Sequence, residues 1–552
     1  MLRQILRERL IKDGKSTKTQ DVQVVPITPL SRKKELPSLK SSLEEKESLE
    51  VQAIKDWKIV VKNSDYVFGL TVDTVTNPTL YNFGNAYFLT QFTGQLNIEG
   101  DLLTSSSDGT RSGVVLTSIA PSKVVQGNSF LWQYGGIRQD YQYAQIKVNS
   151  KGEIYVLGSF TDSITYSNGK SYVTLSSQSK GITYQYFLAK MVPMFDTVKS
   201  SDTIWANVVW ITRISATGLQ DLQININKDP DSSGNYNDDV YLVGTYQGTI
   251  IFDPVPSFTP PTTTLPDDMF ISRITSDGTI LWTITSYKNA SNPNVSSTGY
   301  IRATSVTVGP SSIVAIGSFN ETFSTDASHT VKNYFIPFNM WIAKINFDGT
   351  VSWLISPTSN YNPDSTFATL TSAFVNGTQI VSGEIVSGTS TFYIAGTYQG
   401  SFTFADILDN ESTNPDIFLV KLMDTQVVGG APNWVWQKDI VSPVPKSILQ
   451  VPHISYINNE VYINFFGTTT ASFRTGGVPD VVLNMSGSLD DGINLISSGG
   501  VWGNAPGYIA GVGYNLSVNT APGPSSDTSN PIYLVGTHTM GLYTSEAYLI
   551  QI

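Results

Sequence analysis

The sequence predicts an all-β fold, a seven-bladed β-propeller of four-stranded antiparallel blades with a non-propeller N-terminal arm. Three observations predict it. One strand pattern recurs seven times, turn residues separate the recurring strands, and the strand missing from the last copy stands at the start of the repeat region. A ring of such sheets buries both faces of each sheet against its neighbours. We expect residues 1–55 to form the arm and residues 56–552 the propeller.

The most regular element of the repeat is an apolar strand that ends in glycine followed by Ser or Thr, here called the glycine strand. It occurs as IYVLGSF from residue 154, VYLVGTYQG from 240, IVAIGSF from 313, FYIAGTYQG from 392, VYINFFGTT from 461 and IYLVGTH from 532. The glycines lie 69 to 86 residues apart, at Gly158, Gly244, Gly317, Gly396, Gly467 and Gly536. A weaker copy, AYFLTQFTG from residue 86, carries Thr90 instead. Period-two alternation with turn residues at the junctions indicates strands rather than helices.

Three further strands accompany each glycine strand. A second strand follows it, as in YFLAKM from residue 186, and a fourth, such as AQIKVNS from residue 144, precedes it across a tight turn. In the sixth copy, VVLNM from residue 481 reads as the second strand and GINLISS from 492 as the third. The third strand usually carries tryptophan, at Trp132, Trp210, Trp282, Trp353 and, in the fifth copy, Trp434 and Trp436. We interpret the glycines and tryptophans as packing residues between blades.

The last copy lacks a tryptophan strand, because the chain stops after AYLIQI at Ile552. A matching segment, IKDWKIVVKN around Trp57, stands before the first copy. Pairing it beside residues 547–552 would complete the last blade and leave no open edge between the first and last copies. We therefore expect Trp57 to occupy the position that Trp282 and Trp353 hold in their own copies.

The repeat also resembles a known family. The segments YIAGTYQGSFTF, DIFLVKL and NWVW, with the Asp-Gly turns of RITSDGTILW and KINFDGTVSW, are similar to the SBBP-type β-propeller repeat. The resemblance covers roughly residues 56–552 and is strongest in the third to fifth copies. It implies a propeller fold and supplies no catalytic residues, so it does not define a function.

One position of the second strand is repeatedly polar. It is occupied by Ser118, Lys190, Arg273, Lys344, Lys421, Asn484 and Gln551. In a closed ring these residues would form a circle, which could face an anion. The alternative is that each is a solvated or salt-bridged edge of its own blade.

Few residues suggest catalysis or cofactor binding. The chain has no cysteine and only three histidines, His329, His453 and His538, which lie in different copies. No catalytic triad and no phosphate-binding glycine motif is found, so we expect a protein that is not an enzyme and needs no cofactor. The exception is the loop DPDSSGNYNDD, in which Asp229, Asp231 and Ser233 alternate before a glycine, as in part of a calcium loop. An acidic insertion in an exposed hairpin is the alternative.

The arm differs from the repeats in charge and pattern. Residues 1–56 carry 12 basic and nine acidic side chains, whereas the rest carry 22 and 36, so the propeller is a poor nucleic-acid binder. A short amphipathic helix is predicted near the start, with Leu2, Ile5, Leu6, Arg9 and Leu10 as its partner-binding residues. Such a helix is too short to be stable alone and needs a surface to dock on. A disordered leader is the alternative.

Composition also bears on location. No apolar run is long enough to cross a membrane, and the charged N-terminus is unlike a secretory signal. We expect an intracellular protein or one incorporated in a virion. Three functions remain open: a structural or interaction propeller tethered by its arm to a larger assembly such as a virion or a surface, a carbohydrate-binding propeller with aromatic loops, and a hydrolase using loop carboxylates.

Overall fold

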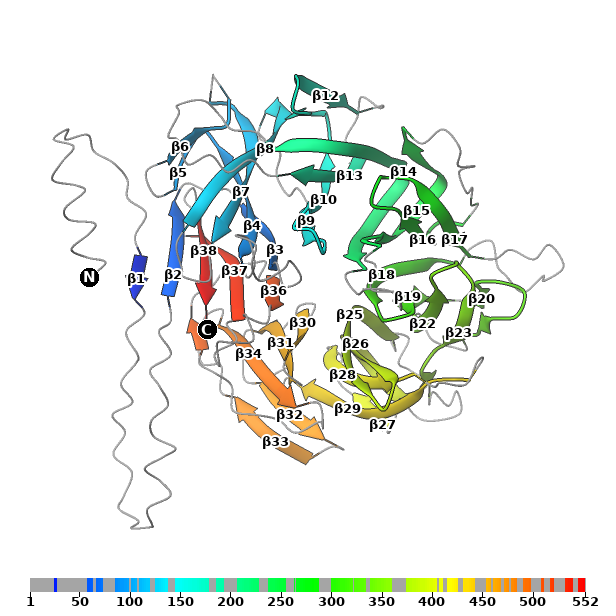
Figure 1. The fold of residues 1–552 in the computed structure, drawn as a ribbon. Coiled ribbons are helices and arrows are strands. Elements are labelled where there is room, and N and C mark those ends of the chain that lie inside the picture. Colours follow the sequence, from blue (N-terminus) through cyan, green and yellow to red (C-terminus); the bar gives the residue numbers. More distant parts are fainter. Residues whose placement is uncertain are drawn as a thin grey trace, which may run out of the picture.

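Every element described in the computed structural model is a β-strand (Figure 1). The structure describes residues 24–26, 57–62, 66–72, 85–98, 101–106, 109–119, 125–137, 144–177, 185–192, 206–227, 237–254, 263, 265–286, 299–320, 322–333, 338–359, 374–404, 407–410, 415–424, 430–441, 453–457, 460–467, 471–475, 478–483, 490–497, 508–510, 517–520, 532–539 and 545–551. The all-β prediction is confirmed for these residues. The predicted helix at residues 2–10 lies outside them.

Most strands belong to antiparallel sets of four, in the order inner strand, glycine strand, second strand and outer strand. The inner strands are β3 (Tyr66–Val72), β9 (Ala144–Val148), the later part of β14 (Asn207–Ile226), β18 (Ile301–Val308), β25 (Phe374–Val386), β30 (His453–Ile457) and β36 (Ser517–Thr520). The glycine strands are β4 (Ala86–Thr93), β10 (Ile154–Phe160), β15 (Val240–Asp253), β19 (Ser312–Phe319), β26 (Thr389–Thr403), β31 (Glu460–Gly467) and β37 (Ile532–Thr539).

The other two positions of each set follow the same chain order. The second strands are β7 (Arg111–Ile119), β13 (Gln185–Val192), β16 (Asp268–Ile274), β22 (Asn339–Asn346), β28 (Asp416–Met423), β34 (Asp490–Ser497) and β38 (Ser545–Gln551). The outer strands are β8 (Val125–Ile137), the early part of β14, β17 (Ile280–Thr285), β23 (Val351–Ile355), β29 (Asn433–Val441), β35 (Tyr508–Ala510) and β2 (Trp57–Lys62). Strand β14 belongs to two sets, because it bends between its pairing with β13 and its pairing with β15.

The sets are arranged in a propeller-like ring with the inner strands toward the centre (Figure 1). Each inner strand contacts the next along the chain, and β36 contacts β3, so the inner strands form a closed circle. At the junction of the two chain ends, β2 pairs with β38 as predicted, and Trp57 lies opposite Gln551. Trp282 and Trp353 lie opposite Arg273 and Lys344 in the same register. The predicted backbone position of Trp57 is therefore confirmed.

Shorter strands tie neighbouring sets together at the periphery. Hairpin strand β11 (Ser163–Ser167), paired with β12 (Tyr172–Ser176), reaches back to β8, and β32 (Ala471–Thr475), paired with β33 (Val478–Leu483), reaches back to β29. The end of β15 pairs with the early part of β14, and the end of β26 pairs with β24 (Thr358–Ser359) and β27 (Ile407–Asn410). The remaining pairs are β5 (Gln95–Ile98) with β6 (Asp101–Thr104) and β20 (Phe323–Ser324) with β21 (Thr330–Val331).

The repeated glycine makes room for an aromatic ring on the second strand. Gly158 lies opposite Phe187 and Gly396 opposite Phe418, and a Cβ atom on either glycine would lie 2.6 Å from that ring. Both β10 and β19 are buried along their whole length, as expected of strands covered on both faces. An aromatic side chain therefore fills the space above each glycine, and this pairing builds the core of each sheet.

Two copies depart from this pairing of a glycine with an aromatic residue. In the first copy Thr90 replaces glycine, and the residue opposite it is Val115 instead of an aromatic residue. In the sixth copy the pair is inverted, because Phe465 occupies the glycine position and lies opposite Gly492. The small and large partners have exchanged strands, so the packed volume is preserved.

The register corrects three predictions. The second strand of the sixth copy is β34, which contains the described part of GINLISS, whereas the described part of VVLNM, residues 481–483, lies in the peripheral hairpin strand β33. Gly467, taken as the repeat glycine, lies two residues beyond the equivalent position. Trp132 lies opposite Val114 and not opposite Ser118, so it does not match the other outer-strand tryptophans. Period-two patterns do not distinguish a central strand from a peripheral one, since both alternate.

Candidate functional site

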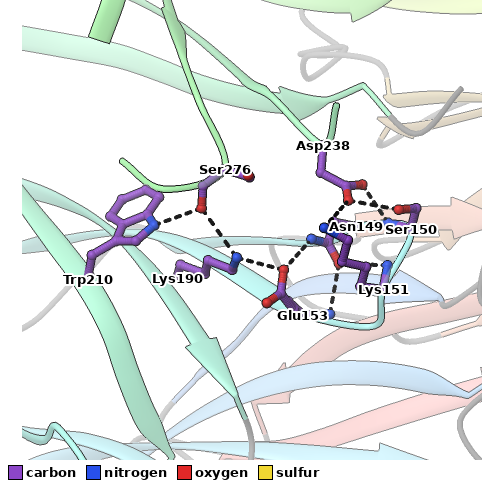
Figure 2. A network of polar contacts seen from close by, with 8 residues as sticks. All are labelled: Asn149, Ser150, Lys151, Glu153, Lys190, Trp210, Asp238 and Ser276. Carbon is purple, nitrogen blue, oxygen red and sulfur yellow. Dashed lines mark hydrogen bonds and ion pairs between the residues drawn. The ribbon is translucent and has the colours of Figure 1, made fainter. Parts of the chain in front are cut away.

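In the second and third sets, the cation of the second strand and the tryptophan of the outer strand reach into the neighbouring sheet, where they hold one turn. Figure 2 shows this arrangement around Lys190 and Trp210. The Lys190 ammonium and the Trp210 indole both donate to the backbone carbonyl of Ser276, at 3.2 and 3.1 Å. Lys190 also forms an ion pair with Glu153, at 2.6 Å. Two side chains of one sheet therefore hold a turn of the next.

The next pair of sheets repeats this contact. The Arg273 guanidinium and the Trp282 indole both donate to the carbonyl of Phe347, the latter at 3.0 Å, while Arg273 binds Asp239. Each held turn contains the Asp-Gly pair of the repeat. Gly349 has a φ of +91°, and a Cβ there would lie 3.1 Å from the Trp282 ring. Glycine is required both by the backbone conformation and by the ring that packs on it.

In the fourth and fifth sets, the second-strand lysine binds a carboxylate. Lys344 forms an ion pair with Asp424, whose other oxygen accepts a hydrogen bond from Trp353 at 3.1 Å. Lys421 binds Glu384 at 2.5 Å, and the Tyr393 hydroxyl donates to the same carboxylate at 2.8 Å. Burial by itself would raise the pKa of Glu384, but the hydrogen bonds from Lys421 and Tyr393 outweigh it and lower this pKa to about 2.

The predicted circle of polar second-strand residues is therefore explained, where its side chains are described, by contacts between and within sheets. All four of its cations pair with acids, as the salt-bridge alternative expected. Ser118 is buried, and Asn484 lies outside the described residues. These cations stabilise neighbouring sheets and are not available to a ligand.

The predicted calcium loop is only partly described. Asp229, Asp231 and Ser233 lie outside the described residues, so their role stays a prediction. The two acids that follow are already engaged. Both oxygens of Asp238 accept hydrogen bonds from Ser150 at 2.8 Å, one from its backbone and one from its hydroxyl, and Asp239 binds Arg273 (Figure 2 for Asp238). In the described part of the chain, no group of three acidic or histidine side chains is placed to hold a metal ion.

Polar side chains of the inner strands cap the free edge of the next inner strand. Gln145 accepts a hydrogen bond from the backbone amide of Ile224 at 3.0 Å, and Gln379 accepts one from Ile454 at 2.7 Å. Ser305 and Thr307 do the same for Ile380 and Ser382. Inner strands are edge strands, so these caps satisfy backbone groups that no strand pairs. These caps were not predicted from the sequence, although the alternating Gln, Ser, Thr and Asn before each glycine strand are their signal.

A partly exposed aromatic cluster lies where three consecutive sheets meet. The Tyr300 and Phe338 rings are 4.8 Å apart, and Phe338, which is 38% exposed, lies 6.5 Å from Phe374. Arg302 stacks 5.3 Å from the Tyr300 ring and donates to Asp267 at 2.7 and 3.0 Å. We call these five residues the aromatic cluster. Apolar rings beside a few fixed polar groups are the usual composition of a small-molecule site.

Asp267, the acid of this cluster, accepts hydrogen bonds from several side chains. Gln247 donates to Asp267 at 3.0 Å and Gln220 at 3.3 Å, in addition to Arg302. Burial raises the pKa of Tyr300, with Arg302 opposing it. Burial also raises the pKa of the neighbouring Asp221, again opposed by Arg302. The polar groups are therefore rigidly positioned beside the rings, which suits recognition of a neutral hydroxylated molecule better than proton transfer.

The other predicted site residues give no catalytic arrangement among the described side chains. His329 bonds Asp326 at 2.8 Å in a loop, whereas His453 and His538 have no described side chains. The arm residues Leu2, Ile5, Leu6, Arg9 and Leu10 lie outside the described residues. Within the part of the chain that is described, there is no helix long and apolar enough to cross a membrane.

Comparisons with known proteins leave the function open. No protein family matches the sequence, and no curated protein matches it. Among solved structures, the polysaccharide lyase Uly1 aligns with 90% of this chain and 98% of its own, at 9% identity and a TM-score of 0.40. A likeness at this level assigns no function to the present chain.

Proposed function

We propose that the chain is a seven-bladed β-propeller that acts as a non-enzymatic interaction module, with residues 1–55 as the arm that tethers it to a larger assembly such as a virion or a cell surface. The closed circle of inner strands and the pairing of β2 with β38 support the propeller. The clamping role of the tryptophans and Asp-Gly turns supports assigning the blades to the SBBP-type repeat that the sequence resembles.

The placement of the arm carries the functional part of the proposal. Its described strand, β1 (Val24–Pro26), pairs with the outer edge of β2 and adds a fifth strand to the closing sheet (Figure 1). The ring is closed by β2, so β1 is an addition on the outside. The segment before β1 carries both basic and apolar residues. Because β1 lies outside the closed ring, this segment can engage a partner without disturbing the ring.

Affinity purification from the native source tests this proposal. We expect the full-length chain to recover one dominant partner that a chain lacking residues 1–50 does not recover. A second variant, Leu6→Asp, should lose the same partner if the predicted helix docks through its apolar face. Identical recovery by all three proteins would refute a tethering arm, provided that far-UV circular dichroism shows the truncated chain to be folded.

Carbohydrate binding is the second candidate, and the aromatic cluster is the observation that favours it. Most described aromatic side chains are buried between sheets, but Phe338 is partly exposed beside Tyr300 and Arg302. Flat rings can stack on the apolar face of a sugar, while Arg302 and the amides near it can bind hydroxyl groups.

A glycan array followed by calorimetry on the best oligosaccharide tests this candidate. Phe338→Ala should weaken binding about tenfold or more, since stacking on an aromatic ring contributes about 1 to 2 kcal/mol. Tyr172→Ala, at a 65% exposed tyrosine of a peripheral hairpin, is the matched control and should bind normally. Equal binding by both variants would exclude the aromatic cluster as the sugar site.

A further inference from the structure

One row of side chains crosses each sheet on the face toward the next sheet. In the second set the row is Lys147, Tyr155, Lys190 and Trp210, each directly opposite its neighbour. Directly opposed residues of antiparallel strands share a face. Tyr155 packs against Trp210 on this face, and Lys190 and Trp210 both donate to the Ser276 carbonyl of the third set, so this face meets the following sheet. Lys147 is the inner-strand member of the row.

Lysine is exceptional at this inner position. The equivalent residues in the other sets are Thr71, Asn225, Thr307, Val381, Ser455 and Asn519, none of them charged. Where side chains are described, Asn225 and Thr307 hydrogen-bond the backbone of the next inner strand, at 3.3 and 2.9 Å. A lysine ammonium cannot accept a bond from a backbone amide. The amide of Ile226 is instead bonded by Asn225 itself, at 2.9 Å.

The charge of Lys147 is not balanced by the nearby acids. Glu153 pairs with Lys190, Asp238 binds Ser150, and Asp239 binds Arg273. Among the described residues, Lys147 has neither a hydrogen-bond acceptor nor an ion-pair partner. Burial lowers the pKa of Lys147, and no carboxylate opposes this shift. An ammonium in this position costs free energy until an anion approaches it.

Lys147 nevertheless remains accessible. Its side chain is half-buried, not sealed, and β9 lies near the centre of the ring (Figure 1). The face of β9 that carries Lys147 also carries Gln145, which reaches β14 of the next set. A small solute that reached this face of β9 would therefore meet the Lys147 ammonium beside the side-chain amide of Gln145.

We propose that the Lys147 ammonium is the cationic element of a binding site for a small oxyanion at the centre of the ring. Phosphate and carboxylate share the required chemistry, because each presents charged oxygens that can accept from the ammonium. The neighbouring polar groups, the inner-strand amides and hydroxyls, would complete the coordination. This site is separate from the arm and from the aromatic cluster.

Isothermal titration calorimetry of the full-length chain tests the proposal. Inorganic phosphate and sodium acetate are titrated separately at pH 7, with sodium chloride keeping the ionic strength constant. We expect saturable binding of at least one anion, about tenfold or more weaker in Lys147→Met and retained within a few fold in Lys147→Arg. The two titrations distinguish a phosphate site from a carboxylate site.

The methionine variant is also a folding control. Because it removes an unpaired charge, Lys147→Met should unfold at the same temperature as the wild type or higher. Lys170→Met, at an exposed lysine between β11 and β12, controls for a general loss of positive charge. The proposal is overturned if neither anion binds the wild type saturably, or if Lys147→Met binds as tightly as the wild type.

Discussion

The Glu384–Lys421 pair offers the sharpest test of how neighbouring strands are held together. Glu384 lies near the tip of the β25–β26 hairpin and accepts from Lys421 and from Tyr393. Lys421 is only 7% exposed. Glu384→Gln keeps the shape and one acceptor oxygen, but it removes the negative charge that pairs with the Lys421 ammonium. Removing one member of a buried pair is strongly destabilising, because the other charge stays buried.

The size of the expected change in the free energy of unfolding follows from the pKa of Glu384. It lies near 2 instead of 4.5, and each unit between the folded and unfolded values corresponds to about 1.4 kcal/mol. The whole difference would be about 3 kcal/mol, and solvent access to the side chain reduces it to about 2 kcal/mol. Because the folded pKa is depressed, this stabilisation is present above pH 4.5 and is lost as the pH falls toward 2.

Urea unfolding followed by tryptophan fluorescence measures the effect. Glu384→Gln should lower the free energy of unfolding by about 2 kcal/mol at pH 7, and the difference from the wild type should shrink steadily between pH 4.5 and pH 2.5. The double variant Glu384→Gln with Lys421→Met should recover part of the loss, because it removes the unpaired ammonium. A difference that is the same at pH 7 and pH 3 would refute the reasoning.

Three more predictions follow from the fold. Gly158→Ala should destabilise the chain by about 1 to 3 kcal/mol in urea, because its Cβ would lie 2.6 Å from the Phe187 ring; an unchanged midpoint would contradict the glycine–aromatic rule. Deleting residues 56–62 should lower the melting temperature by several degrees more than deleting residues 1–50, since only the first deletion opens the ring; equal melting temperatures would argue against closure by β2. If the loop around Asp231 binds calcium, calcium should raise the melting temperature of the wild type after chelation but not that of Asp231→Ala, and a response in both would place any calcium elsewhere.

Much of the architecture could be predicted from the sequence. Period-two alternation predicted the strands, and the absence of a tryptophan strand from the last copy predicted that Trp57 lies beside the last strand. Two of the three errors fell on the sixth copy, where VVLNM and GINLISS alternate equally well, and the third concerned Trp132 of the first copy. Choosing between them requires knowing which one lies opposite Phe465, and that depends on contacts across a loop of variable length.

The candidate sites were much less predictable. The sequence presented Lys190, Arg273, Lys344 and Lys421 as a possible anion-facing circle, but their partners lie 34 to 86 residues away and face them only after the sheets assemble. No sequence pattern distinguishes Lys147, because a single lysine in a strand is ordinary. It became notable only when the register showed neutral residues at all equivalent positions.

By itself, the sequence determined the repeat, the strand order within it and the strand that closes the ring, because local alternation and turn residues encode these features. Only the tertiary structure decided which polar residues are satisfied and which are available. Hydrogen bonding and charge compensation depend on distances between segments that are remote in the chain, so Lys190 forms an ion pair with Glu153 whereas Lys147 has no partner among the described residues.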